Sequence, residues 1–200
     1  MKFKLSIITF LCLITLVGCD KNSENSQNLD TSKSENQNLT ESNTIQAKKN
    51  EIQNKKFELT LLNGKKVALQ QNGDNFDINY EGDTEKKATL FVFFATWCPP
   101  CKAEIPHLNN LSEKFKEDLN IIAILLENKS DAEILEFAKT YNIKYDISVG
   151  DANYILEKAV GGVDGLPSSI MYNVKGEYVI GYKGLVPEEM LESDILKAIK

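Results

Sequence analysis

The sequence predicts a single α/β domain whose mixed β-sheet is covered by helices on both faces. Three observations lead to this prediction. Strand-like and helix-like segments alternate from about residue 55 to residue 200, two strand-like segments are continuous apolar runs typical of fully buried strands, and an Asn63-Gly64 pair marks an amino-terminal β-hairpin. A chain of 200 residues with 42% hydrophobic content accommodates one such domain and additional chain outside it.

The apolar periodicity of the sequence predicts the first elements of the domain. Residues 56–69 alternate apolar and polar side chains about the Asn63-Gly64 pair, which predicts two strands joined by a tight turn. Residues 88–95 form an apolar, aromatic run that predicts a buried strand. Residues 100–118 have helical spacing, and we expect Pro106 to kink this helix. Its predicted inner face consists of Ile105, Leu108, Leu111 and Phe115.

A second buried strand is predicted at 119–127, and a helix follows it after Ser130. Ser130 and Glu133 have the spacing of a capping box, in which each side chain bonds the backbone N–H of the other residue. The predicted inner face of this helix consists of Ile134, Leu135, Phe137, Ala138 and Tyr141.

The carboxy-terminal part continues the alternation with shorter elements. We expect a strand at 145–150, a helix at 152–160, two strands at about 169–174 and 177–183 that turn at Lys175-Gly176, and a closing helix at 187–200 with Pro187 near its first position. These elements complete one domain at 56–200.

The first 18 residues have the pattern of a secretory signal. Lys2 and Lys4 precede an apolar core from Leu5 to Val17, which is shorter than the roughly 20 residues that a membrane-spanning helix needs. The core ends in "LVGC", which resembles the bacterial lipobox. The resemblance implies lipid attachment to Cys19 and cleavage before it, and the alternative is an ordinary cleaved signal that leaves Cys19 a free thiol.

Residues 19–55 are expected to form a disordered, lipid-anchored tether. The segment from Asp20 to Lys55 is rich in Asn, Ser, Gln, Glu and Lys and contains no aromatic residue, glycine or proline. Such a composition buries too little apolar surface to offset chain entropy. A flexible chain of this length reaches roughly 30–35 Å, which would hold the domain above a membrane. A specific binding role for the segment remains an alternative.

Charge and cysteine content narrow the classes of function. The formal net charge is −6, and the 23 basic residues are all lysines without a basic cluster, which argues against a nucleic-acid partner. Of the four cysteines, Cys12 lies in the predicted signal and Cys19 in the lipobox. Cys98 and Cys101 remain as a pair, and in an exported protein such a pair meets conditions in which disulfides persist.

The region of the cysteine pair resembles the thioredoxin superfamily. A buried strand, "WCPPC" at a helix start, and a distant proline that opens a later strand form the thioredoxin pattern. More narrowly, "ATWCPPCKAEIP" is similar to the TlpA/ResA/CcmG branch of membrane-anchored thiol–disulfide oxidoreductases, as are the amino-terminal hairpin and a small central insertion near 145–160. The resemblance covers about 145 residues, with its most specific segments at Trp97–Pro106 and Gly165–Ser168. It implies a thioredoxin-like fold and a redox-active disulfide in place of a cofactor.

The helix start suits a reactive thiol. Unpaired backbone N–H groups and the helix dipole stabilise a thiolate at Cys98, and Pro99 and Pro100 suit first helical positions because they have no N–H to satisfy. We expect Cys98 to lie at an exposed tip and act as the nucleophile. Cys101, one turn inward, would resolve the mixed disulfide. Both roles match those of the family.

Glu104 and Trp97 are further candidates for functional residues at this site. Glu104, three residues beyond Cys101, shares its helix face and could accept the Cys101 proton. The resemblance supports this role, because a glutamate stands at the same position in the ResA-like branch. Thioredoxins place a buried aspartate on the strand, where this chain has Val92. The alternative for Glu104 is a solvated surface acid. Trp97 would shield the disulfide, or else serve as a plain packing aromatic.

Pro167 matches the cis-proline of the family, which packs against the dithiol and pairs with clients; the alternative is an ordinary trans turn proline. Ser168 follows it where the family usually has threonine. His107, the single histidine, is expected to be an exposed polar residue. We expect no metal site, because a zinc set would need a second ligand pair that the sequence does not contain.

The leading hypothesis is a monomeric, membrane-anchored protein-disulfide reductase on the extracytoplasmic face of the cell membrane. The resemblance implies clients such as apocytochrome c or a copper-site protein, and electrons from a membrane donor of the DsbD/CcdA type. A protein-disulfide oxidase or isomerase is the first alternative, although the stretch between Glu127 and Pro167 is too short for the helical insertion of DsbA-type oxidases. A metal-binding assembly chaperone is the second.

Overall fold

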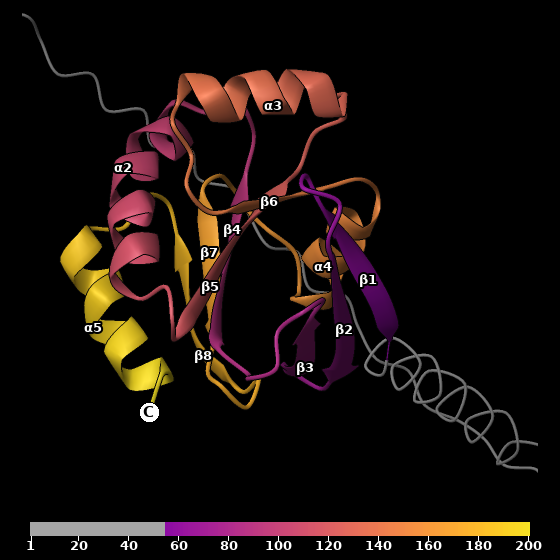
Figure 1. The fold of residues 1–200 in the computed structure, drawn as a ribbon, viewed down its shortest axis with the longest axis vertical. Coiled ribbons are helices and arrows are strands. Elements are labelled where there is room, and N and C mark those ends of the chain that lie inside the picture. The colour runs from indigo at the N-terminus through magenta and orange to yellow at the C-terminus, as the bar shows by residue number, and fades with distance from the viewer. Residues whose placement is uncertain (1–54) are drawn as a thin grey trace, which may run out of the picture.

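The structure, a computed structural model, describes residues 55–200 as an eight-stranded sheet with four helices (Figure 1). The predicted signal at 1–18, the lipidation site Cys19 and the tether up to residue 54 lie outside the described residues. The strands are β1 (Lys56–Leu61), β2 (Lys66–Asn72), β3 (Asn75–Tyr80), β4 (Ala88–Phe94), β5 (Leu119–Leu125), β6 (Asp146–Val149), β7 (Ser168–Tyr172) and β8 (Tyr178–Lys183). The helices are α2 (Pro99–Lys114), α3 (Asp131–Thr140), α4 (Ala152–Ala159) and α5 (Glu188–Ala198).

The sheet is mixed, and β4 lies near its middle. Its strand order is β3-β2-β1-β6-β5-β4-β7-β8. β4 pairs parallel with β5 and antiparallel with β7, and β5 pairs parallel with β6. Every residue of β4 is buried, as the apolar run at 88–95 predicts. The strand therefore positions the cysteine motif rigidly, because the motif begins three residues after it ends.

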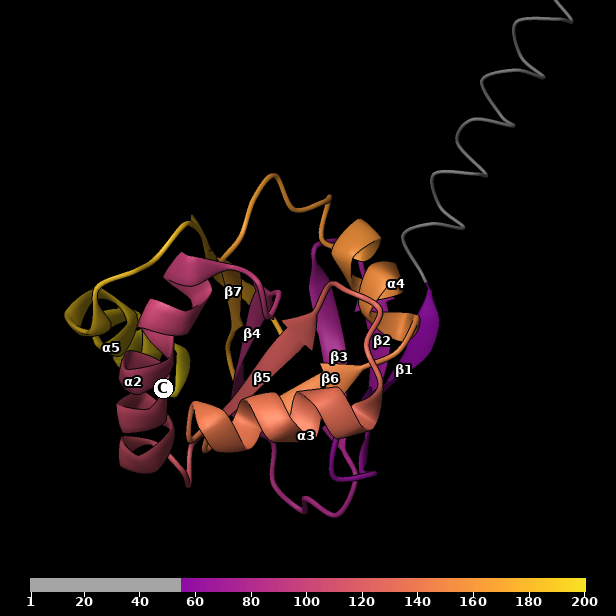
Figure 2. The ribbon, with the colours of Figure 1, turned by 90° about the horizontal axis from the view of Figure 1, so that it is seen from above.

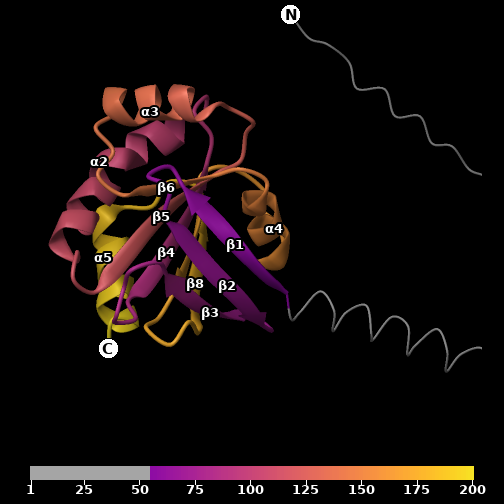
Figure 3. The ribbon, with the colours of Figure 1, turned by 45° about the vertical axis from the view of Figure 1, so that its right-hand side comes forward.

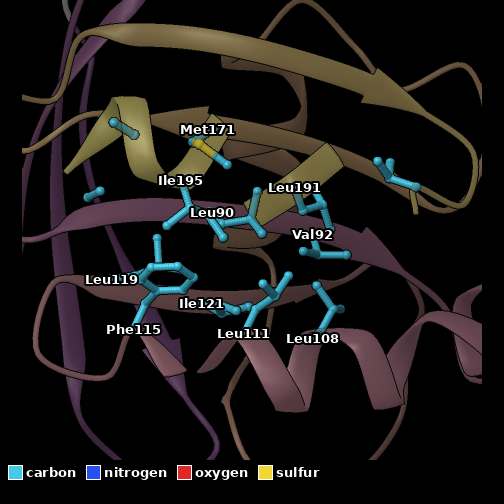
Figure 4. Close-up of a cluster of buried hydrophobic side chains, with 13 residues drawn as sticks. Leu90, Val92, Leu108, Leu111, Phe115, Leu119, Ile121, Met171, Leu191 and Ile195 are labelled. Atoms are coloured by element: carbon cyan, nitrogen blue, oxygen red, sulfur yellow. The ribbon is translucent and has the colours of Figure 1, made fainter. Parts of the chain in front are cut away.

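Three helices cover one face of the sheet and one helix covers the other (Figures 2 and 3). On the first face α2 and α5 pack over β4, β5 and β7, and α3 adds Ile134 to a neighbouring cluster. The close-up of this layer shows the labelled apolar side chains of both sheet and helices gathered in one core (Figure 4). The labelled residues of this core are Leu90, Val92, Leu108, Leu111, Phe115, Leu119, Ile121, Met171, Leu191 and Ile195.

The second face is closed by α4 and by the amino-terminal strands. Leu156 of α4 packs with Phe91 and Phe93 of β4 and with apolar residues of β1, β2 and β5. Asn153 anchors the helix, because its buried amide donates to the carbonyls of Leu125 and Ser148 at 2.9 and 2.8 Å. The central insertion is therefore part of the core and not a surface addition.

Strand β3 was not predicted from the sequence. Residues Asn75–Tyr80 alternate buried and more exposed side chains, and they pair with β2 across a turn at Gly73. The turn between β7 and β8 closes against this strand, because Phe76 N–H donates to the Gly176 carbonyl at 2.8 Å. A Cβ on Gly176 would meet the Phe76 carbonyl oxygen at 1.6 Å, so only glycine fits there.

Helix α3 departs in part from prediction. In α3 the capping box of Ser130 and Glu133 is confirmed, but Leu135 and Tyr141 are exposed and were wrongly placed on its inner face. Only Ile134 of this helix is fully buried, and Phe137 and Ala138 pack against the same cluster, so its apolar face is narrower than the sequence pattern predicted. Helix α2 spans Pro99–Lys114 with Pro106 inside it, so it ends four residues before the predicted end at 118.

Candidate active site

The cysteine motif is fixed by backbone hydrogen bonds that join β4 to α2. Cys98 is the residue that caps the amino terminus of α2, and its backbone N–H donates to the Ala95 carbonyl at 3.1 Å. The Cys98 carbonyl accepts the N–H of Lys102, which begins the helical pattern. The Cys98 sulfur accepts the N–H of Cys101 at 3.2 Å. A sulfur atom thus occupies the position that a serine or aspartate oxygen takes at ordinary helix starts.

Cys98 and Cys101 form a disulfide bond, with 2.07 Å between the sulfurs and 5.3 Å between the Cα atoms. The expected exposed tip is wrong for this oxidised form. Cys98 is 2% exposed and Cys101 is 5% exposed, and both belong to an apolar cluster with Phe94 and Ala95. The Cys98 sulfur turns inward because the residue that caps a helix points its side chain back over the first turn, and Cys101 faces the same cluster from the first turn of α2.

The exposed groups around the disulfide are its neighbours in the chain. Pro99 and Pro100 are the first two residues of α2, as predicted, and both are exposed. Trp97 is 66% exposed, so it is not a packing aromatic of the core. These three apolar side chains are therefore the exposed surface next to the buried sulfurs.

Glu104 is buried, which rules out the alternative of a solvated surface acid. Its side chain is 1% exposed and lies on α2 one turn after Cys101. Oε1 accepts the backbone N–H of Val186 at 3.1 Å, and this residue lies between β8 and α5. Among the residues of 55–200, Oε2 is one of four buried side-chain atoms without a hydrogen-bond partner. The carboxyl group therefore keeps one oxygen free in the protein interior.

Burial raises the pKa of Glu104 above its ordinary value of 4.5, because the ionised form loses its hydration. The Val186 N–H and the charge of His107 oppose this effect and lower the pKa of Glu104. Burial also raises the pKa of Tyr145, and the charge of Glu104 adds to this rise, which shows that the two groups share one environment. A carboxylate with a raised pKa is a stronger base than one on the surface.

The expected cis-proline is confirmed: the Leu166–Pro167 peptide bond is cis. Leu166 packs against the cluster that contains both cysteines, so the proline loop borders the disulfide. The Pro167 carbonyl accepts the N–H of Gly184 at 2.7 Å, and Ser168 Oγ donates to the Gly165 carbonyl at 2.8 Å. The segment 184–186 is thus bonded to the proline loop at one end and to Glu104 at the other.

His107 is partly buried, so the expectation of an exposed polar residue is wrong. Its Nδ1 atom is buried and has no hydrogen-bond partner within residues 55–200. The same part of the chain contains no group of three or more His, Cys, Asp or Glu side chains that could hold a metal ion.

A model of the AhpC/TSA family matches residues 49–188, more than half of the chain. The chain belongs to the AhpC/TSA family. Two relatives of this protein are thiol-disulfide oxidoreductases ResA. That of Bacillus thuringiensis subsp. konkukian (strain 97-27) is 30% identical over 141 residues, 70% of this chain and 73% of the relative. That of Bacillus subtilis (strain 168) is 27% identical over 145 residues, 72% of either chain.

Solved structures support the fold assignment of this AhpC/TSA-family protein. A putative thiol:disulfide interchange protein DsbE from Chlorobium tepidum superposes with a TM-score of 0.58 at 21% identity and covers 74% of this chain and 96% of its own. The pneumococcal exposed lipoprotein thioredoxin of Streptococcus pneumoniae strain TIGR4 gives a TM-score of 0.54 at 18% identity, over 72% and 99%. The predicted thioredoxin-like fold is therefore confirmed.

Together, the cysteine geometry and the relatives identify this AhpC/TSA-family protein as a thiol–disulfide oxidoreductase of the ResA/DsbE type. Enzymes of this kind use a redox-active cysteine pair rather than a bound cofactor. In residues 55–200, no helix has the length and apolar character needed to cross a bilayer.

Two contacts of the site were not predicted. Glu127 follows β5, and its Oε1 accepts the backbone N–H of Thr96 at 2.5 Å, which holds the segment that enters the cysteine motif. The parallel register of Phe94 with Leu125 places Thr96 beside Glu127, so a correct strand pairing would have revealed this contact. The bond from Val186 to Glu104 spans 82 residues and has no signal in the local sequence.

Proposed function

We propose that this protein is a lipid-anchored, extracytoplasmic oxidoreductase that reduces disulfide bonds of client proteins through Cys98 and Cys101. The observation that carries the proposal is the position of the pair: the sulfur of Cys98 caps α2, and a buried carboxyl group with a free oxygen lies one turn beyond Cys101. The cis-proline loop, which borders the same cluster, supplies backbone for docking a client.

In the first step the thiolate of Cys98 attacks one sulfur of a client disulfide. A bond forms between Cys98 and that sulfur, and the other client sulfur leaves as a thiolate and takes a proton from water. The N–H of Cys101 already points to the Cys98 sulfur and stabilises its negative charge, as does the positive end of the α2 dipole.

In the second step Cys101 resolves the mixed disulfide. Glu104 accepts the proton of the Cys101 thiol, and the new thiolate attacks the Cys98 sulfur. The Cys98–Cys101 disulfide forms, and the reduced client leaves with its second thiolate. The environment of Glu104 favours this role, because burial raises its pKa. Val92, at the position of the thioredoxin aspartate, lies in the apolar core and has no group that could accept a proton.

Sequence features outside the described residues support the proposed location. The "LVGC" motif ending at Cys19 favours lipid attachment, and two or more acyl chains at Cys19 would hold the protein stably at a membrane surface. The pneumococcal structural relative is itself described as an exposed lipoprotein. From the resemblance we infer electrons from a membrane donor of the DsbD/CcdA type, and clients such as apocytochrome c or a copper-site protein.

Trapping of clients tests the proposal. A Cys101→Ser variant of the full chain cannot resolve its mixed disulfides, so we expect clients to stay bound to Cys98 and to be identified by mass spectrometry after non-reducing purification. A Cys98→Ser, Cys101→Ser variant is the matched control and should trap nothing through this site. If the single variant forms no more adducts than the double variant, the proposed reduction of protein disulfides is wrong.

A further inference from the structure

A cavity of about 500 Å³ opens on the face of the sheet that α4 covers, where the end of this helix meets the β2–β3 turn. Small-molecule sites typically have volumes of about 300–1,000 Å³, so the cavity is large enough for a ligand. The β2–β3 turn, the end of α4 and the strands β7 and β8 form its walls. Cys98, Cys101 and Glu104 do not line it, so it is separate from the disulfide site.

Gln71 is a buried polar side chain of this cavity that is only partly bonded. It is 4% exposed, because the alternation of β2 turns it to the same buried face as Val67 and Leu69. Its Nε2 donates to the carbonyls of Gly73 and Ala159 at 3.0 and 2.9 Å. Its Oε1 is buried and has no hydrogen-bond partner in the part of the chain that the structure describes.

The two bonds from Nε2 fix the orientation of the Gln71 amide. If Oε1 and Nε2 changed places, the oxygen would face two carbonyl oxygens and both bonds would be lost. Oε1 is therefore an acceptor, and a buried acceptor without a donor costs free energy. A molecule in the cavity that presents an N–H or O–H group to Oε1 removes this cost.

The other walls of the cavity suit an aromatic ring. Tyr172 and Tyr178 both line it, with ring centroids 6.2 Å apart and ring planes at 78°. Ile170, Ala159 and Val160 add aliphatic surface that the core buries only in part. Aromatic rings bind one another in edge-to-face or offset arrangements, and the two tyrosines offer both a face and an edge.

The rim of the cavity carries one charge of each sign. Asp74 and Lys158 line it, and both are exposed. Among the described residues that form the walls, no other side chain is charged at neutral pH. The site therefore has no net charge, which favours an uncharged ligand over an anion or a cation.

We propose that this cavity binds a small, uncharged aromatic molecule, which donates a hydrogen bond from an N–H or O–H group to Gln71 Oε1. The site goes beyond the proposed disulfide chemistry, because α4 and α2 lie on opposite faces of the sheet. Binding there requires no change in the cysteine pair.

The test compares two probes of nearly equal size on the isotope-labelled, full-length protein in its disulfide form. Indole carries an N–H donor, and benzofuran has an oxygen acceptor in its place. NMR titration follows the backbone amide signals. We expect indole to shift the signals of Gly73 and Gly161, which line the cavity, with a dissociation constant below about 1 mM. It should bind about tenfold more tightly than benzofuran, because only indole pairs with Oε1.

Three variants locate the binding. Gln71→Leu removes the acceptor and should abolish the preference for indole over benzofuran. Tyr178→Ala shortens a wall at a residue that is 50% exposed, and it should weaken both probes about threefold or more. Tyr154→Ala, at an exposed tyrosine of α4 outside the cavity, is the matched control and should bind both probes as the wild type does.

The comparison of the two probes on the wild type decides the proposal even if Gln71→Leu does not fold. Equal affinities for indole and benzofuran would overturn it, as would shifts confined to residues outside the cavity. No shift with either probe would mean that the cavity holds only water and would also overturn it. A preference for indole that persists in a folded Gln71→Leu variant, or equal losses in Tyr178→Ala and Tyr154→Ala, would contradict the assigned site.

Discussion

The amino termini of α2 and α3 differ in the side chains that bond their free backbone N–H groups. At α3 the Ser130 hydroxyl and the Glu133 carboxylate bond the free backbone N–H groups, and acidic residues fill the first turn. At α2 the first turn contains no acidic residue, two prolines take the first positions, and the sulfur of Cys98 serves as the cap. A polar cap stabilises a helix, whereas an uncompensated helix end stabilises an added negative charge. The amino terminus of α2 therefore leaves its positive end available to stabilise a thiolate at Cys98, as the proposed first step requires.

The carboxyl groups of the two helices differ in the same way. The backbone N–H of Ser130, together with Lys129 and the Ser130 hydroxyl, lowers the pKa of the exposed Glu133 to about 2. Burial raises the pKa of Glu104. The charged form of Glu133 therefore stabilises the folded protein. The charged form of Glu104 destabilises it, and the proposed chemistry gives this buried carboxylate a role as a base.

The largest expected effect is the loss of activity in a Cys98→Ser variant, which tests whether Cys98 acts as the nucleophile or only as the cap of α2. Serine is itself a good capping residue, so Cys98→Ser should leave the dithiol form of the protein about as stable as the wild-type dithiol. Its disulfide reductase activity should fall more than about 1000-fold, because the nucleophile is lost. Insulin reduction and denaturant unfolding under reducing conditions measure the two quantities. Residual activity above a few percent would mean that another thiol of the chain performs the first attack.

At α3 the corresponding substitution should act on stability alone. Ser130→Ala removes the capping oxygen and should lower the free energy of unfolding by about 1 kcal/mol, with insulin reduction unchanged. A Ser130→Asp variant keeps a capping oxygen and is the matched control. A marked loss of turnover in Ser130→Ala would show that the two helix ends are coupled, which the structure does not predict.

The smallest expected effects concern the pH dependence of stability. Because the pKa of Glu104 is raised in the folded state, its contribution favours folding below about pH 4.5 and is lost as the pH rises through the folded pKa. The wild type should therefore lose stability relative to Glu104→Gln as the pH rises from about 4.5.

Glu133 should show the opposite slope. Its lowered pKa gives a contribution that is present above about pH 4.5 and is lost as the pH falls toward about 2. Unfolding titrations of Glu104→Gln and Glu133→Gln across this range check both signs. Parallel slopes in the two variants would contradict the assigned environments.

The contrast between the helices also explains what could be predicted from the sequence. The capping box at Ser130 and Glu133 and the cysteine pair are local patterns, so spacing alone identified them. The cis-proline at Pro167 followed from resemblance and was confirmed. β3 carries a local alternation at Phe76, Ile78 and Tyr80 that was overlooked, so its omission was avoidable.

Other features depend on how distant segments meet. The burial of Glu104 and its bond to Val186 require the loop between β8 and α5, and the contact of Thr96 with Glu127 requires the β4–β5 register. The depth of Cys98 depends on the direction of its side chain over the first turn of α2. Spacing along the chain carries no information on any of these.

The reduction potential of the Cys98–Cys101 pair tests the central claim most directly. Equilibration of the full-length protein with glutathione or dithiothreitol redox buffers, followed by quantification of the dithiol form, yields this value. A reductase of protein disulfides requires a potential more negative than about −200 mV, in the range of glutaredoxins and thioredoxin, and the account predicts this result. A potential near about −120 mV, as in strong protein oxidants, would contradict it.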